Sequence, residues 1–452
     1  MSETEAFARS AMIPAAEPPV SERGAIKWLR ENLFSGPVNI ALTLIGLWIV
    51  WSILSALIPW LLNSVWNAGS LGECRQIVLD RQGLTLNEAG KTVNAAGDLV
   101  ESTGGACWAV IRERWNQWLF GFYPRDLYWR PTLALVLMFV ALAPVLFQSV
   151  PRRLFWFTIL FPGLGFWLLW GGTAWVPVGA MLGFVVLGAS YRVLQGSLGV
   201  PVAAGLGIVT AALWWLYPDK AFIDIMSRAV PVALAPVSSD EFGGFLLALV
   251  IGVTAISFSL PLGILLALGR QSDMFIVKTL SVGFIEFIRG VPLITLLFTA
   301  SLLLQYFLPP GTNFDIILRV IILVTFFAAA YLAEVIRGGL AALPRGQYEA
   351  ADALGLDYWR AQRLIIMPQA LKVSIPGIVS TFIGLFKDTT LVSFVGLLDP
   401  LRGVTAAVRA DINWKGIYWE PYIFVGAIFF VFCFGMSRYS MYLERKLRTD
   451  RQ

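Results

Sequence analysis

The sequence predicts an all-α membrane protein with about ten transmembrane helices. Of its 452 residues, 57% are hydrophobic and only 14% are charged, whereas soluble globular chains carry about a quarter charged residues. The hydrophobic residues come in long uncharged runs, and a run of about 18 or more such residues predicts a membrane span. Because backbone polar groups in lipid must bond within their own segment, these runs are expected to be helices.

Ten hydrophobic runs are candidate spans, and the polar stretches between them divide the chain into three predicted domains. Residues 1–36 form a polar tail, residues 37–241 a transmembrane extension with a charged insert at 63–130, and residues 242–452 the remaining spans. The runs are Pro37–Leu62, Pro131–Val150, Leu154–Trp170, Val176–Val193, Pro201–Tyr217, Phe242–Leu268, Val282–Leu308, Ile316–Arg337, Ala370–Leu398 and Pro421–Leu443.

Basic residues gather in four short segments, and these set the expected orientation in the membrane. Cytoplasmic loops retain Lys and Arg, and such clusters occur in both terminal tails, at Arg152–Arg153 and in the loop Leu340–Lys372. An even number of spans with a cytoplasmic N-terminus puts all four inside, so both termini are expected in the cytoplasm and the insert outside. The same bias explains the net charge of +5 without nucleic-acid binding. The first run is too long for a signal-peptide core and is expected to remain as an anchor.

The chain has no histidine and only three cysteines, which argues against His-based, zinc or iron–sulfur sites. We therefore expect no bound metal and no cofactor held by this chain. Cys74 and Cys107 both lie in the external insert, where an oxidising compartment favours a disulfide; the alternative is two free thiols. The bond would restrict the unfolded insert by about 3–4 kcal/mol. Cys433 lies in the last run and is expected to pack between helices.

The segment Tyr348–Pro368 has the pattern of a helix, a glycine turn and a second amphipathic helix that ends before the proline. Ala350 and Ala351 are small enough for another surface to approach the backbone, and Gly355 can adopt a positive φ that reverses the chain. Asp357 is placed to cap the second helix. A cytoplasmic helix–turn–helix between two spans suits a groove on a soluble partner; the alternative is an ordinary structured loop.

This pattern resembles the EAA loop of ABC-importer permeases, which combines Glu-Ala-Ala, a glycine and a terminal Leu-Pro at this spacing; here Met367 replaces the leucine. Further segments make the stretch from about Gly243 to the C-terminus similar to the polar amino-acid permease family. These segments are Pro261–Ala267, Glu286–Leu293, Glu334–Gly339 and Lys387–Ser393. The long N-terminal half with its insert is similar to the larger permease subunit of general L-amino-acid importers. The resemblance implies a type I ABC-importer core in residues 242–452 that translocates L-amino acids by alternating access.

The resemblance also implies that the loop Leu340–Lys372 contains a coupling helix that docks on an ABC ATPase. The implied coupling residues are Glu349, Ala350, Ala351, Leu354, Gly355 and Tyr358. Gly90–Thr92 has the sequence Gly-Lys-Thr, but Thr85 stands five residues before Gly90, where a phosphate-binding loop needs a glycine. This segment is therefore not such a loop, and ATP and Mg would be used by a separate ATPase dimer. Other implied partners are a second permease in a heterodimer, a periplasmic amino-acid-binding protein and the lipid of a bacterial inner membrane.

Ionisable side chains within spans are costly in lipid, so they usually line a cavity or pair with one another. The ninth run contains such a group, which we assign to the substrate pathway: Lys387, Asp388, Thr389, Thr390 and Ser393. Asp388 can accept from the ammonium of an amino acid, and Lys387 or the Thr hydroxyls can donate to its carboxylate. The alternative is an ion pair, either Lys387–Asp388 or one between helices, that only holds the fold.

Two further pairs of opposite charge are spaced i, i+3 near the inner ends of their spans. Glu286 with Arg289, and Glu334 with Arg337, can each pair on one helix face, and we expect a structural or gating role for both. Pro292 is expected to bend its helix, because it lacks a backbone N–H.

The rival to an ATP-driven importer is an ion-coupled secondary transporter or channel, which leaves the EAA-like loop unexplained. Two other rivals are a membrane enzyme and a membrane scaffold. An enzyme would need a nucleophile, a set of metal ligands or a histidine, and a scaffold would use only the external insert. Co-purification with an ATPase and a second permease distinguishes the importer from these alternatives.

Overall fold

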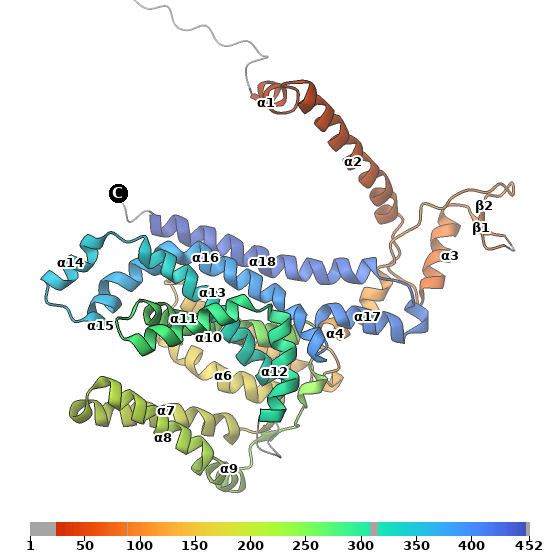
Figure 1. Cartoon of the computed structure of the whole chain (residues 1–452). Coiled ribbons are helices and arrows are strands. Elements are labelled where there is room, and N and C mark those ends of the chain that lie inside the picture. The colour runs from red at the N-terminus through yellow and green to blue at the C-terminus, as the bar shows by residue number, and fades with distance from the viewer. Residues whose placement is uncertain (1–23, 88, 308–314, 449–452) are drawn as a thin grey trace, which may run out of the picture. The chain divides into compact units, whose positions relative to one another are not determined.

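The computed structural model describes residues 24–87, 89–307 and 315–448, and in this part of the chain the architecture is almost wholly helical (Figure 1). The chain separates into two compact units, Met1–Ala109 and Val110–Gln452. All the segments expected to carry the function, other than the cysteines, fall in the second unit.

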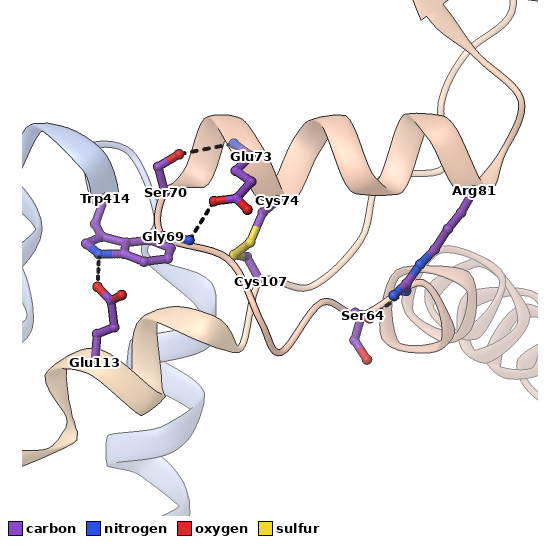
Figure 2. Close-up of a disulfide and its surroundings, with 9 residues drawn as sticks. All are labelled: Ser64, Gly69, Ser70, Glu73, Cys74, Arg81, Cys107, Glu113 and Trp414. Carbon is purple, nitrogen blue, oxygen red and sulfur yellow. Dashed lines mark hydrogen bonds between the residues drawn. A yellow bond between two sulfur atoms is a disulfide. The ribbon is translucent and has the colours of Figure 1, made fainter.

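The first unit contains one long apolar helix and a small polar insert. Its elements are α1 Gly24–Asn32, α2 Pro37–Leu62, α3 Leu71–Arg81, and the antiparallel strands β1 Thr85–Leu86 and β2 Thr92–Val93. Helix α2 has 26 residues and is long and apolar enough to cross a membrane. Helix α3 begins at Ser70, whose side chain accepts from Glu73 N, while Glu73 Oε2 accepts from Gly69 N (Figure 2). This reciprocal arrangement satisfies two backbone donors at the start of the helix.

A disulfide holds the insert together. Cys74 on α3 is bonded to Cys107, with the two Cα atoms 6.0 Å apart (Figure 2), and both side chains are buried. Cys107 also forms a backbone bridge with Val65. The crosslink therefore ties α3 to both ends of the insert segment, which has few apolar residues of its own to bury.

The second unit contains the remaining helices. Those long enough to span a membrane alone, or with a short 3₁₀ or π segment, are α5 Trp129–Leu146, α6 Phe155–Trp170, α7 Trp175–Leu198, α10 Gly244–Gln271, α13 Ile316–Ala341, α16 Met367–Asp388 and α18 Trp419–Arg448. The other helices are α4 Ala109–Phe120, α8 Val200–Leu216, α9 Pro218–Ala229, α11 Phe275–Gly290, α12 Leu293–Phe307, α14 Arg345–Ala353, α15 Tyr358–Ala361 and α17 Pro400–Ala410. The short segments are η2 Arg125–Leu127, η3 Arg152–Leu154, η4 Ser239–Glu241, η5 Gln362–Ile366, η6 Thr389–Val395 and η7 Ile412–Trp414, with the antiparallel strands β3 Gly172–Thr173 and β4 Ala233–Leu234.

Among the described residues of the whole chain, eight helices can cross a membrane, or up to ten if each of two bent pairs counts as one span. This range includes the predicted ten. The predicted single span Val282–Leu308 consists of two helices, α11 and α12, which meet at 101°. Val291 and Pro292 form the break, as expected for a proline that cannot donate to the preceding turn.

The centre of the second unit is formed by four helices: α10 packs on α13, α13 on α16, and α16 on α18 (Figure 1). Small residues make the closest approaches, as is usual between helices in lipid. A Cβ on Gly263 of α10 would lie 2.8 Å from the Leu332 Cβ of α13, and one on Gly339 of α13 would lie 2.6 Å from the Ala370 carbonyl oxygen of α16. These backbones therefore admit no larger side chain at those points.

A buried carboxylate fixes the start of α17. Asp399 is 1% exposed, and its side chain accepts from the backbone N–H groups of Leu401 and Arg402. Burial raises the pKa of this carboxyl from 3.8 to about 6, despite these hydrogen bonds. The folded protein therefore binds a proton more tightly than the unfolded chain between about pH 4 and pH 6.

We predict that the disulfide contributes most of the stability of the insert. Replacing Cys74 and Cys107 together by alanine should lower its free energy of unfolding by about 3–4 kcal/mol, because a crosslink over 33 residues restricts the unfolded chain. Limited proteolysis should then cut the insert faster, while Cys433→Ala changes nothing there. Recovery of both cysteines as free thiols in non-reducing peptide mapping of the wild type contradicts this prediction.

We also predict a pH-dependent effect of Asp399→Asn. The contribution of the Asp399 carboxyl to folding is complete below about pH 4 and declines as the pH rises through about 6, because ionisation is disfavoured in the buried site. The asparagine variant, which can still cap the helix, should have a higher free energy of unfolding than the wild type at about pH 8, by at most about 3 kcal/mol. The difference should vanish toward about pH 4.

The matched control is Asp357→Asn, since Asp357 caps α15 in the same way but is exposed. At about pH 8 this variant should not be more stable than the wild type, because the replaced carboxylate is exposed and no burial is relieved. An Asp399→Asn protein that is less stable than the wild type at about pH 8 contradicts the prediction.

Candidate functional site

The loop after α13 consists of α14, a tight turn and α15, which continues through the π-helical segment η5 into α16. It is anchored from within the chain by buried Leu340, Ile366 and Met367, which pack with residues of α10 and α13. Gln369 on α16 also donates to the Gln347 side chain on α14, at 2.9 Å. The loop is therefore a defined extension of the α13–α16 pair.

The turn follows the local rules expected from its residues. Gly355 has a φ of +68°, a conformation that disfavours other residues, and its N–H bonds to the Asp352 carbonyl at 2.9 Å. The Asp357 side chain accepts from Arg360 N at 3.0 Å and so caps α15. The expected end of this helix before Pro368 is wrong, because η5 leads directly into α16 and Pro368 lies in the first turn of α16.

The side chains of the loop divide into a buried and an exposed set. Ala351 is 1% exposed, so the expectation that both alanines face a partner is wrong for Ala351. Glu349, Ala350 and Gly355 are exposed. The large apolar residues left exposed are Leu354, Tyr358, Trp359 and Leu364. An apolar surface on a polar, basic loop is typical of a site that contacts another protein.

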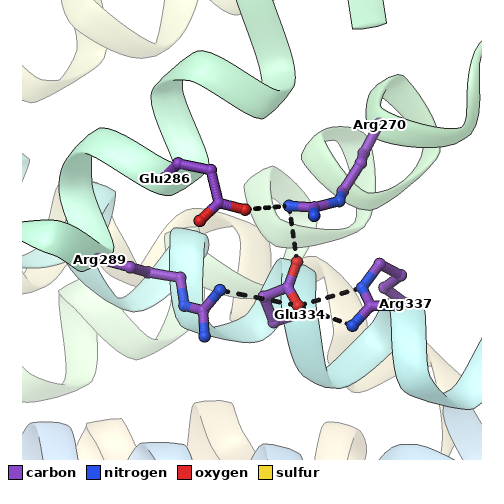
Figure 3. Close-up of polar contacts among 5 residues, drawn as sticks. All are labelled: Arg270, Glu286, Arg289, Glu334 and Arg337. Atoms are coloured by element: carbon purple, nitrogen blue, oxygen red, sulfur yellow. Dashed lines mark hydrogen bonds and ion pairs between the residues drawn. The ribbon is translucent and has the colours of Figure 1, made fainter.

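A cluster of five charged residues joins the ends of α10, α11 and α13 (Figure 3). Arg270 donates to Glu286 at 2.8 Å and lies 2.9 Å from Glu334 Oε1. Arg337 donates two 3.0 Å hydrogen bonds to Glu334 Oε2, and Arg289 Nη1 lies 3.7 Å from the same oxygen. Glu334 is thus the carboxylate shared by all three arginines.

The cluster agrees with one expected pair and departs from the other. Glu334 and Arg337 pair within α13 as expected. The expected Glu286–Arg289 pair is wrong, since Glu286 pairs with Arg270 on α10 and Arg289 with Glu334 on α13. Spacing within α11 permits the local pair, but neighbouring helices offer both side chains partners between helices.

A cavity of about 270 Å³ lies between α13 and α16. Its lining consists of Phe327, Ala328 and Tyr331 of α13 with Thr381, Gly384, Leu385 and Asp388 of α16. Phe327 and Tyr331 pack with ring centroids 4.8 Å apart. The Thr381 hydroxyl donates to the Gly377 carbonyl. Asp388 is the charged residue among those that line this cavity.

The other residues assigned to the substrate pathway are arranged differently from Asp388. Thr389, Thr390 and Ser393 each donate their hydroxyl to a backbone carbonyl three residues earlier, and none of them lines the cavity. Lys387 is exposed, and no ion pair joins it to Asp388 in the described part of the chain. Asp388 is therefore available to a ligand.

A larger cavity, of about 1130 Å³, lies among α4, α5, α6 and α10. Its lining contains no charged side chain: aromatic and aliphatic residues dominate, and the polar side chains include Asn116, Thr132 and Thr254. A zwitterion needs both an acceptor for its ammonium and a donor for its carboxylate. The smaller cavity beside Asp388 fits that chemistry better.

Arg270 and Tyr331 were not selected from the sequence, although both contact the charged cluster. Arg270 ends a hydrophobic run, so it resembles an ordinary interfacial charge. Tyr331 lies three residues before Glu334 on α13, on the same side of the helix, and this spacing was the available signal. The Arg289 guanidinium lies over the Tyr331 ring, with the Arg289 Cζ 5.6 Å from the ring centroid.

Comparison with known proteins gives a consistent set of similarities. Residues 259–449 match the family described as binding-protein-dependent transport system inner membrane component. Over its full length the chain is 66% identical to the full length of the glutamate/glutamine/aspartate/asparagine transport system permease protein BztC of Rhodobacter capsulatus. It is 38% identical to the inner membrane amino-acid ABC transporter permease protein YhdY of Escherichia coli, over 94% of each chain.

A shorter relative matches less than half of the chain. The glutamate/aspartate import permease protein GltK of Escherichia coli is 32% identical over 209 residues, which cover 45% of this chain and 91% of the relative. The family match, residues 259–449, begins within α10 and covers the helices that follow it.

Proposed function

Because this chain belongs to the inner-membrane permeases of amino-acid ABC importers, we propose that its α14–α15 loop docks on the ATPase and that the Asp388 cavity receives the amino acid. The observation that carries this proposal is the course of α13. Its middle lines the cavity, through Phe327 and Tyr331, and its end leads within three residues into α14. One helix thus joins the cavity to the docking loop.

An importer of this family works with an ATPase and with a binding protein that delivers the substrate. We infer three finer points for this chain. The second permease differs from it, so the membrane core is a heterodimer; ATP and Mg bind to the ATPase subunits; and both termini lie in the cytoplasm. The basic clusters of the tails and of the loop Leu340–Lys372 support this orientation.

The docking surface consists of the exposed apolar residues around the glycine turn. Leu354 is 72% exposed and Trp359 61% exposed, although both are large apolar side chains. Ala351, by contrast, is buried within its own chain, where α14 contacts η5. We propose that Ala351 keeps the loop rigid on its own chain, while Glu349, Ala350, Leu354 and Tyr358 meet the ATPase.

The cavity offers chemistry for one end of an amino acid. Asp388 can accept hydrogen bonds from an ammonium group, and the faces of Phe327 and Tyr331 favour a nearby cation. A volume of about 270 Å³ accommodates a single amino acid. The relatives named for glutamate, glutamine, aspartate and asparagine support acidic amino acids and their amides as the substrates.

We predict that Gly355→Val uncouples the importer. A β-branched residue at φ +68° is strongly disfavoured, so the turn should rearrange and displace Leu354 and Tyr358. ATP-driven uptake in proteoliposomes should fall by at least about tenfold, and less ATPase should co-purify with the tagged chain in mild detergent. That fall corresponds to about 1.4 kcal/mol.

The matched control is Gly346→Val in the same loop. Gly346 lies within α14 and an added Cβ there meets no atom within 4 Å, so uptake should stay within about twofold of the wild type. Full ATP-driven uptake by the Gly355→Val complex would remove the coupling role of the loop.

We further predict that Asp388→Asn weakens amino-acid binding to the assembled importer. Loss of a charge-assisted hydrogen bond costs about 1.5–3 kcal/mol, so the Kd for L-glutamine should rise about 10- to 100-fold. Thr390→Val serves as the control, because that hydroxyl is bonded to the Lys387 carbonyl and does not line the cavity. Equal Kd values for the wild-type and Asp388→Asn complexes would exclude this cavity as the site.

A further inference from the structure

The charged cluster of Figure 3 has more positive than negative charge. It contains three arginines, Arg270, Arg289 and Arg337, and two glutamates, Glu286 and Glu334. These five side chains alone therefore carry one uncompensated positive charge.

Arg289 is the least firmly bound of the three arginines. Arg270 contacts two carboxylates at 2.8 and 2.9 Å, and Arg337 makes two hydrogen bonds of 3.0 Å. Arg289 reaches Glu334 only at 3.7 Å, beyond hydrogen-bond distance. Its Nε is buried and has no hydrogen-bond partner among the described residues. Donors of this guanidinium are therefore left for an additional acceptor.

The position of Arg289 relates it to the cavity. Its guanidinium lies over the ring of Tyr331, with Cζ 5.6 Å from the centroid, and Tyr331 lines the cavity together with Asp388. Tyr331 thus separates a cation with spare donors, Arg289, from a cavity whose lining includes Asp388, a carboxylate with no ion-pair partner in the described chain. A free amino acid carries the complementary pair of charges.

We propose that Arg289 binds the carboxylate of the transported amino acid while Asp388 holds its ammonium. The inference rests on the proposed function of the cavity and adds the residue that recognises the acid group. Planar guanidinium groups bind carboxylates through two parallel hydrogen bonds. On binding, Arg289 exchanges its long contact with Glu334 for the ligand, and Glu334 keeps Arg270 and Arg337.

Two consequences follow for specificity and for transport. The two backbone charges of the ligand are recognised and its side chain is left to the aromatic walls, which allows several amino acids to share the site. The exchange also changes the charge balance where α10, α11 and α13 meet, close to the docking loop. Binding of an amino acid in the cavity therefore changes, through Arg289, the ion pairs at the cytoplasmic end of α13.

The test compares two ligands across variants of this chain, in a complex of the permeases with the ATPase and without the binding protein. Binding of L-glutamine and of L-glutamine α-carboxamide is measured at about pH 6, where both α-amino groups are protonated. The wild type should bind the acid at least about tenfold more tightly than the amide, since a hydrogen bond to a charged group is worth about 1.5–3 kcal/mol. In Arg289→Gln that preference should fall to within about threefold.

The control variant is Arg337→Gln, which removes a charge from the same cluster but not the group over Tyr331. It should keep the wild-type preference for the acid, even if its overall affinity changes. Arg289→Lys, which keeps the charge but not the planar fork, should show an intermediate preference and replaces Arg289→Gln if that complex does not assemble.

The outcomes separate this inference from the proposed function. If Asp388→Asn abolishes binding while Arg289→Gln and Arg289→Lys keep the full preference for the acid, Arg289 is not the carboxylate site although the cavity is. If Asp388→Asn binds L-glutamine normally, the cavity assignment fails, and the carboxylate assignment fails with it.

Discussion

The close packing of α10, α13 and α16 is the constraint on which the rest of the second unit depends. Helices in lipid gain little from the hydrophobic effect, so they must hold together by close contact of their backbones. Gly263 and Gly339 provide that contact on the two sides of α13, and the α13 residues Ala328, Ala329, Ala330 and Ala333 are almost fully buried. The result is a central helix fixed on both sides, which can transmit a displacement along its length.

The features to which we assign a function are placed along this central helix. Tyr331 in its middle contributes to the Asp388 cavity, Glu334 one turn later gathers the arginines of three helices, and the chain then enters the docking loop. Charges at the end of a span are expected to stay hydrated or paired. Here they are paired between helices, so the same contacts that stabilise the junction of α10, α11 and α13 also connect the cavity with the loop.

Local features of the site were predictable from the sequence, whereas partners between helices were not. Gly355 has the positive φ that its position requires and Asp357 caps the next helix, because both depend on residues within one turn. The direction of Ala351 and the choice of partner for Arg289 depend on how α14 and α11 are rotated against other helices, which spacing along one helix does not determine. For the same reason Asp388 could not be distinguished from its polar neighbours until α13 was seen to form the other wall of the cavity.

The central claim is that α13 and α14 act as one rigid connection between the cavity and the ATPase. The most direct test is a flexible insertion of about three glycines after Ala342, in the short linker between these helices, because glycine removes conformational restraint without adding new contacts. ATPase activity of the assembled complex and amino-acid uptake are measured together in proteoliposomes. Retained ATP hydrolysis with uptake lost is the predicted result. Retained hydrolysis with full uptake would contradict the account.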